Sequence, residues 1–149
     1  MSEQMLPGVT AIIVAAGASR RMGFDKLSYR LPDGRTVLQT SCDALAAHPA
    51  VRQRVLVAGG NRAACEAIAA GCAKPCTVVP GGQTRADSVR SGLGAAREEL
   101  VAIHDAARPF VSREVITAAL RAAACTGAAA PAVPVKDTIK VADAQGRVQ

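Results

Sequence analysis

Short apolar runs alternate with helical segments along most of this chain of 149 residues. In open α/β folds, each buried parallel strand is followed by a helix that covers one face of the sheet. The alternation therefore predicts an α/β fold with a mostly parallel sheet and helices on both faces. The predicted strands are residues 11–14, 55–58, 77–79, 100–103 and 129–135. The predicted helices are residues 37–47, 62–70 and 113–123, which Thr36, Asn61 and Ser112 cap, and about 86–97.

The pattern changes from Asp137 onward. A strand, an Asp/Gly turn and the beginning of a returning strand are predicted between residues 137 and 149. We interpret residues 1–136 as one α/β domain that binds a ligand, and residues 137–149 as the first part of an incomplete, protruding β-arm. Because so short a second strand does not complete a stable hairpin, we expect the sequence to be part of a longer protein.

The loop after the first predicted strand carries the clearest sign of ligand binding. The strand is followed by small residues, whose backbone N–H groups can approach an anion closely: Ala15, Ala16 and Gly17. Cationic side chains come next, at Arg20, Arg21 and Lys26. This combination is typical of a phosphate-binding loop, although it is neither a P-loop nor the glycine fingerprint of dinucleotide-binding folds.

Charge and composition argue against several other classes of protein. The net charge is +6, but the basic residues are spread along the chain, which favours a local phosphate site over a nucleic-acid-binding face. Aromatic residues make up 2% of the chain, too few for the stacking platforms that bind single strands. No apolar run has membrane-spanning length, and no secretory signal is recognised. The five cysteines lack metal-binding spacing and are interpreted as reduced thiols, so we expect a cytoplasmic protein.

A glycine pair follows the third predicted strand and leads into a helix. Gly81 and Gly82 allow the backbone to approach a flat base, and Ser88 adds a hydroxyl that donates or accepts. Asp87 is a candidate helix cap, and Arg85 is expected to pair locally. An ordinary loop with a helix cap is the alternative interpretation of this motif.

A carboxylate and an arginine follow the fourth predicted strand. Asp105, beside small residues, suits Mg²⁺ or a ribose hydroxyl, and Arg108 suits a substrate phosphate, with a surface ion pair as the alternative. His104 is interpreted as structural, because a phosphate that attacks phosphorus needs no general base. Lys136 and Thr138 are candidates for an acceptor pocket or plain edge-strand residues.

These motifs resemble, in order and spacing, those of the 2-C-methyl-D-erythritol 4-phosphate cytidylyltransferases of the non-mevalonate isoprenoid route. The resemblance rests on AAGASRRM at residues 15–22, with Ser19 where the signature prefers glycine, on GGQTRADSV at 81–89 and on HDAARP at 104–109. It implies a Rossmann-like fold and the transfer of CMP from CTP to 2-C-methyl-D-erythritol 4-phosphate, giving 4-diphosphocytidyl-2-C-methyl-D-erythritol and pyrophosphate. It also implies direct attack on the α-phosphorus, without a covalent enzyme intermediate.

Residue roles follow from the same resemblance. Arg21 and Lys26 are expected to be catalytic, contacting the triphosphate and stabilising the crowded α-phosphate. Mg²⁺ is implied, held mainly by phosphate oxygens with Asp105 as the candidate protein ligand, and a homodimer is implied through the β-arm. The implied nucleotide-binding residues are Ala15, Ala16, Gly17, Gly82, Gln83, Ser88, Asp105 and Ala106. The implied acceptor-binding residues are Asp105, Arg108 and Thr138.

Two alternatives stay open at this point. One is a cytidylyltransferase for another polyol phosphate, such as ribitol 5-phosphate. The other is an inactive nucleotide-binding fragment, because members of the resembled family continue well beyond residue 149 with further substrate-binding residues. Members of the family also often carry an acidic residue where this chain has Gln83.

Overall fold

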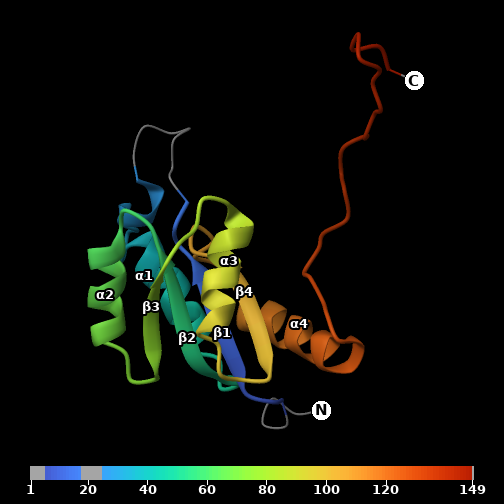
Figure 1. The fold of residues 1–149 in the computed structure, drawn as a ribbon. Coiled ribbons are helices and arrows are strands. Elements are labelled where there is room, and N and C mark those ends of the chain that lie inside the picture. The colour runs from blue at the N-terminus through green and yellow to red at the C-terminus, as the bar shows by residue number, and fades with distance from the viewer. Residues whose placement is uncertain (1–5, 18–24, 149) are drawn as a thin grey trace.

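Four parallel strands form a single sheet in the order β3-β2-β1-β4 (Figure 1). The computed structural model describes residues 6–17 and 25–148. The strands are β1 (Val9–Val14), β2 (Val51–Ala58), β3 (Cys76–Pro80) and β4 (Leu100–Asp105). In this register Val14 lies beside both Val57 and Asp105, so the carboxyl ends of β1, β2 and β4 meet at one edge.

The helices follow the strands in the predicted alternation. They are α1 (Val37–Ala46), α2 (Arg62–Ala70), α3 (Arg85–Gly94) and α4 (Arg113–Thr126), and a short 3-10 helix, η2 (Lys26–Ser28), precedes α1. None of these helices is both long and apolar enough to cross a membrane within the described residues. The predicted parallel α/β fold is confirmed.

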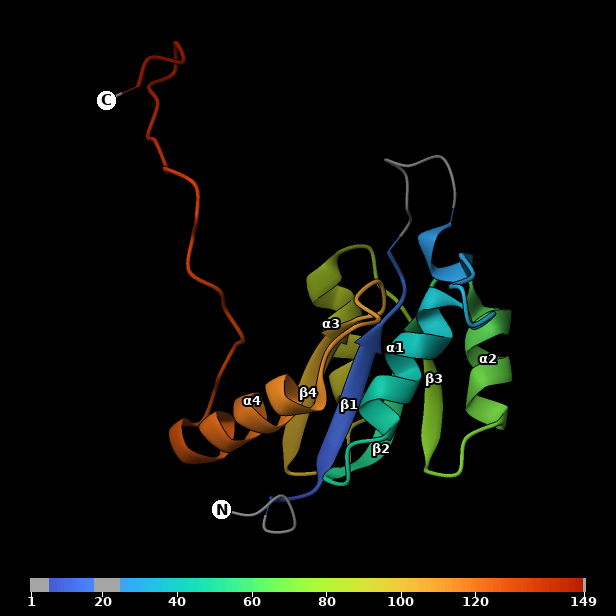
Figure 2. The same ribbon diagram turned by 180° about the vertical axis from the view of Figure 1, so that it is seen from behind.

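Helices pack on both faces of the sheet, as the two opposite views show (Figures 1 and 2). Alternate side chains of β1 enter different cores, because successive residues of a strand point to opposite faces. Ala11 and Ile13 belong to the larger core, which α1, α2 and α4 cover, whereas Ile12 belongs to the smaller core under α3. All three side chains are fully buried, so β1 is the centre of the molecule.

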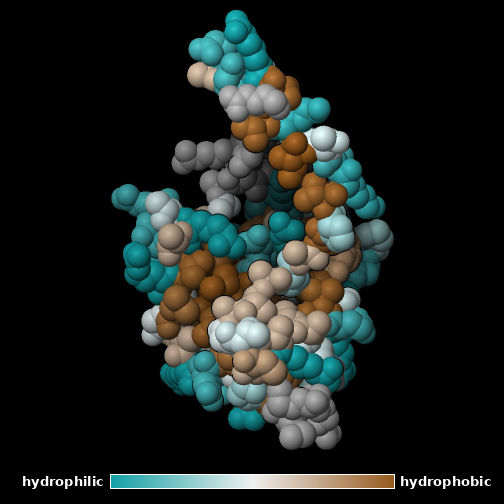
Figure 3. All heavy atoms as spheres, turned by 90° about the vertical axis from the view of Figure 1, so that its right-hand side faces the viewer, coloured by the Kyte–Doolittle hydropathy of each residue, from teal (hydrophilic) through white to brown (hydrophobic). Residues whose placement is uncertain are grey.

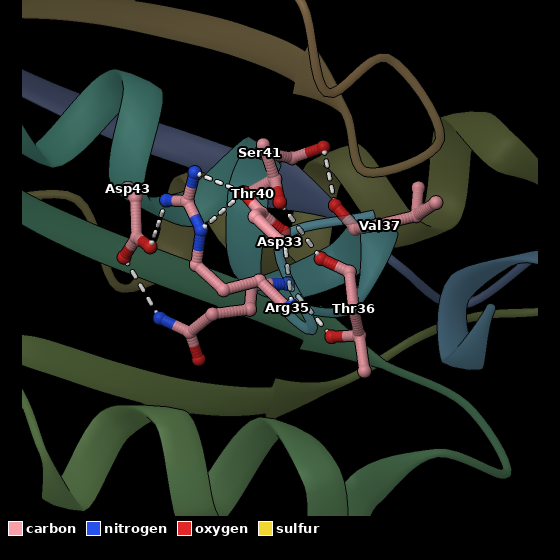
Figure 4. Close-up of polar contacts among 8 residues, drawn as sticks. Asp33, Arg35, Thr36, Val37, Thr40, Ser41 and Asp43 are labelled. Carbon is pink, nitrogen blue, oxygen red and sulfur yellow. Dashed lines mark hydrogen bonds and ion pairs between the residues drawn. The ribbon is translucent and has the colours of Figure 1, made fainter. Parts of the chain in front are cut away.

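Two of the three predicted caps are confirmed. Thr36 Oγ1 accepts a hydrogen bond from the N–H of Gln39 at 3.1 Å, and Ser112 accepts one from the N–H of Val115. Beside the first turn of α1, Arg35 makes ion pairs with the carboxylates of Asp33 and Asp43 (Figure 4).

The third predicted cap is confirmed in position but not in its hydrogen bond. Asn61 stands at the N-cap position of α2, but its side chain makes no capping hydrogen bond there. The helix predicted at about 86–97 is α3, which begins with a capping box: Thr84 Oγ1 accepts from the N–H of Asp87, and the carboxylate of Asp87 accepts from the N–H of Thr84.

The strand predicted at residues 129–135 does not form. The chain leaves α4 at Gly127, whose φ of 87° ends the helix, and residues 128–141 run as an irregular segment. Pro131 and Pro134 lack backbone N–H groups and cannot donate to a strand ladder, so apolar character alone did not produce a strand. Within the described part of the chain, no strand pairs with the outer edge of β4.

The start of the predicted β-arm is present only as its turn. Gly146 has a φ of 80°, and a single antiparallel bridge joins Ala142 to Val148. The whole C-terminal segment, residues 128–148, extends away from the body (Figures 1 and 2). The space-filling view shows apolar side chains exposed along it (Figure 3). Val133 and Ile139 are two exposed apolar residues of this segment.

Candidate functional site

A pocket of about 1140 Å³ opens at the carboxyl ends of the strands. This is the edge at which open parallel sheets bind their ligands. The pocket brings together most of the predicted site, from three separate parts of the sequence: Ala15, Ala16, Gly17, Lys26, Gly82, Gln83, Ser88, Asp105, Ala106 and Arg108. Thr138 does not line the pocket, because the segment that carries it leaves the body after α4. Arg20 and Arg21 lie outside the described residues.

The described lining of the pocket is rich in positive charge. Lys26, Arg85 and Arg108 contribute cationic side chains, and Asp105 is the one acidic lining residue in the described ranges. Lys26 begins η2, whose position is set by Asp25: the carboxylate of Asp25 accepts from the N–H of the buried Leu27. An anionic ligand is therefore favoured over a cationic one.

Asp105 is held between two arginines. Its Oδ1 lies 2.6 Å from Arg85 Nη2, and its Oδ2 lies 3.3 Å from Arg108 Nε. The hydrogen bond from Arg85 is the largest of the effects that lower the pKa of Asp105 below 3.8, and Arg108 adds to it. The carboxylate is therefore ionised at neutral pH and links α3 to the end of β4.

The turn that carries Asp105 is fixed from both sides. The N–H of the next residue, Ala106, donates to the carbonyl of Val14 at 3.1 Å. The carbonyl of Ala106 accepts a 2.6 Å hydrogen bond from the hydroxyl of Ser41, a fully buried residue of α1. The site therefore rests on the main core through α1 as well as on the sheet.

The glycine loop after β3 is held by Ser88. The hydroxyl of Ser88 accepts from the N–H of Gly82 and donates to the carbonyl of Thr84, each at 3.1 Å. Ser88 is 3% exposed, so its hydroxyl acts mainly inside the loop. This loop packs directly against the loop after β1, because a Cβ on Gly81 would overlap the methyl group of Ala16.

The backbone of Ala15 is also engaged. Its N–H donates to the carbonyl of Val57 at 2.8 Å, and its carbonyl accepts from the side-chain amide of Asn61 at 3.1 Å. The carbonyl oxygen can accept a second hydrogen bond from a ligand, whereas the N–H has already donated its one hydrogen bond.

His104 lies beneath this edge. Its Nε2 is 3.0 Å from the carbonyl oxygen of Arg108, and burial lowers its pKa from 6.5. A neutral imidazole therefore donates to that carbonyl and braces the turn, in agreement with a structural role.

Two residues of the site were missed at the level of sequence. Arg85 was expected to pair locally, yet its partner Asp105 is 20 residues away. Asn61 was predicted as a helix cap, yet it contacts Ala15, 46 residues earlier. Neither contact can be predicted from the neighbouring sequence, because the sheet topology alone brings the two residues of each pair together.

The described residues do not fit a protein-held magnesium site. Both oxygens of Asp105 face guanidinium groups, and no cluster of three or more carboxylate, histidine or cysteine ligands occurs in the described ranges. Mg²⁺ prefers several oxygen ligands, so the side chain of Asp105 offers it little in this arrangement.

Comparison with known proteins gives a consistent result. The family model of 2-C-methyl-D-erythritol 4-phosphate cytidylyltransferase (IspD) matches residues 9–149. A bifunctional enzyme IspD/IspF from Anaeromyxobacter dehalogenans is 44% identical over 141 residues, 94% of this chain and 36% of that protein. The 2-C-methyl-D-erythritol 4-phosphate cytidylyltransferase of Alkaliphilus metalliredigens is 39% identical over 140 residues, 89% of this chain and 58% of that protein.

A solved structure agrees in fold. The 4-diphosphocytidyl-2C-methyl-D-erythritol synthase of Anaerococcus prevotii superposes with a TM-score of 0.77 at 26% identity, over 95% of this chain and 63% of that one. The chain thus spans between about one third and two thirds of the length of these relatives. Because the family match runs from β1 to the C-terminal segment and the fold agrees, the chain belongs to the 2-C-methyl-D-erythritol 4-phosphate cytidylyltransferase family.

Proposed function

We propose that the protein carrying this sequence transfers CMP from CTP to 2-C-methyl-D-erythritol 4-phosphate and releases pyrophosphate. One observation carries the proposal: a cationic pocket at the strand ends gathers Lys26, the Gly82 loop and the Asp105–Arg108 turn. The relatives named above support the choice of both substrates.

The proposed reaction joins two anions, so its main demand is charge neutralisation and alignment. Lys26, together with Arg21, contacts the triphosphate and stabilises the charge that builds up on the α-phosphoryl group. The base lies against the backbone of Ala15, Gly82 and Gln83. Arg108 receives the phosphate of the acceptor, which attacks the α-phosphorus in line while pyrophosphate leaves.

Three further features belong to the proposal. Mg²⁺ enters with the triphosphate, bound by phosphate oxygens. The complete protein forms a homodimer through the arm that begins near Asp137. It works in the cytoplasm, which agrees with five cysteines that are all free.

Lys26→Ala tests the catalytic assignment. Removing one preorganised donor to the transition state is expected to lower turnover about 10²–10³-fold, while CTP binding weakens far less. Turnover is measured as pyrophosphate release and CTP binding by calorimetry. Arg90→Ala is the matched control, because Arg90 is exposed, pairs with Asp87 and does not line the pocket. Equal losses of turnover and CTP affinity in Lys26→Ala would contradict the role given to Lys26.

Product analysis separates the proposed acceptor from its rival. Parallel assays with 2-C-methyl-D-erythritol 4-phosphate and ribitol 5-phosphate are expected to give a diphosphocytidyl product with the first. CTP binding without pyrophosphate release from either acceptor would favour a nucleotide-binding fragment.

A further inference from the structure

Asn61 occupies a capping position without capping its helix. Asparagine at an N-cap normally accepts a hydrogen bond from the first turn, and that contact stabilises the helix by about 1 kcal/mol. Here no such bond forms. Oδ1 of Asn61 instead accepts from the N–H of Gly59, and Nδ2 donates to the carbonyl of Ala15, each at 3.1 Å. An N–H only donates and a carbonyl only accepts, so these two partners fix which way the amide points.

The carbonyl that Asn61 holds belongs to the pocket. Ala15 lines it, and the N–H of Ala15 is already bonded to Val57. Of the backbone groups of Ala15, the carbonyl oxygen can therefore still accept a hydrogen bond from a ligand, through its second lone pair. Because Asn61 takes the first lone pair, the direction from which a ligand can donate is restricted.

The next residue, Ala16, has little room to move. A Cβ on Gly59 would lie 2.9 Å from the carbonyl oxygen of Ala16, and one on Gly81 would overlap the methyl group of Ala16. Ala16 thus lies against the chain that follows β2 and β3, next to the carbonyl that Asn61 holds.

We propose that Asn61 is a positioning residue that helps to select the base. It aims the Ala15 carbonyl so that the oxygen accepts from the exocyclic amino group of cytosine. Uracil presents a carbonyl oxygen at the same place, and two acceptors repel each other there. This inference rests on the proposed function, because it assumes that CTP occupies the pocket.

Asn61→Asp separates the two contacts of the side chain. Aspartate keeps the acceptor for Gly59 and is as good a helix cap as asparagine, so the fold is retained. It loses the donor to Ala15. Arg62→Ala is the matched control, because it changes the neighbouring residue, whose side chain pairs with the exposed Glu66 and does not line the pocket.

Calorimetry with CTP and UTP gives the decisive ratio. Loss of one hydrogen bond is expected to reduce the preference for CTP over UTP about 3- to 10-fold in Asn61→Asp and to leave it unchanged in Arg62→Ala. The added negative charge weakens both nucleotides alike, so the ratio does not report it. An unchanged ratio in Asn61→Asp, in a protein that prefers CTP, overturns the inference and leaves the proposed function standing.

Amide hydrogen exchange tests the positioning without nucleotide. The N–H of Ala16, which belongs to the same peptide group as the Ala15 carbonyl, is expected to exchange faster in Asn61→Asp than in the unmodified protein or Arg62→Ala, and unchanged exchange overturns the positioning role. An unmodified protein that does not prefer CTP contradicts the proposed function itself, and with it the selection of the base.

Discussion

Asp105 connects two motifs that are far apart in the sequence. Arg85 begins α3, directly after the glycine loop, Arg108 lies in the turn after β4, and both contact the same carboxylate. Both ion pairs lie at the pocket, so the start of α3 and the turn after β4 are coupled through one side chain. A substitution of Arg85 should therefore change the pKa of Asp105.

Arg85→Gln is expected to raise the pKa of Asp105 toward 3.8, because it removes the partner with the largest lowering effect. The pKa of Asp105 is lower in the folded protein than in the unfolded chain. These ion pairs therefore stabilise the fold fully at a pH above the unfolded pKa, and the stabilisation is lost as the pH falls through the folded pKa. Carbon NMR titration of the carboxylate measures the shift. Arg90→Gln, which removes the partner of Asp87 instead, should leave Asp105 unmoved.

The residues predicted from sequence are those whose role is local. Lys26 and Gly82 follow strands within short motifs, and strand ends of a parallel sheet meet at one edge. Arg85 and Asn61 were assigned local partners because periodicity and capping rules see only a few neighbouring residues. Their actual partners depend on the strand order, which no single motif encodes.

At the level of elements, α3 shows how closely a helix approaches the sheet. Gly92 faces Ile12 and Val57, and a Cβ there would lie 2.5 and 3.1 Å from their methyl carbons. Gly94, two residues later in the same helix, has open space around it. The two glycines form a matched pair for separating packing from helix propensity.

Gly92→Ala is expected to destabilise the protein by about 1–3 kcal/mol, because overpacking outweighs the gain in helix propensity. Gly94→Ala is expected to stabilise it by up to about 1 kcal/mol, the propensity gain alone. Urea unfolding monitored by circular dichroism measures both. Equal effects of the two substitutions would show that α3 can move away from the sheet at little cost.

The strands of the body could be predicted because strands buried on both faces read as short apolar runs, and the helices because they follow those strands in alternation. Residues 129–135 could not, because an apolar run says nothing about whether a partner strand is available. The edge strands β3 and β4 are where a further strand could pair, and in the described part of the chain neither has a second partner strand. The strand prediction for residues 129–135 was wrong because no partner strand pairs with them, although the residues are apolar.

At the level of the molecule, a packed body contrasts with an extended C-terminal segment. The larger core takes in β1, α1 and α4, whereas residues 128–141 are exposed throughout. Val133 is 85% exposed and Ile139 is 76% exposed, so the segment contributes little to the stability of the body.

Brief trypsin digestion is expected to cut after Lys136 and Lys140 before it cuts inside α4 or β2. Both lysines are exposed in irregular chain, and proteases need an extended, accessible backbone. Mass spectrometry of the early products identifies the sites, and the thermal unfolding midpoint of the trimmed body should stay within a few degrees of the intact chain. Early cleavage at Arg54, in the middle of β2, would show that the body itself opens.

The central place of β1 has a consequence for synthesis on the ribosome. This strand is made first, yet it pairs with β2 on one side and with β4 on the other. Its second neighbour is not available until Asp105 has been translated and has left the exit tunnel. In the nascent chain Ile12 and Ile13 therefore stay without their full cover at least until residue 105 has emerged, and exposed apolar strands of this kind are prone to aggregate and are bound by chaperones.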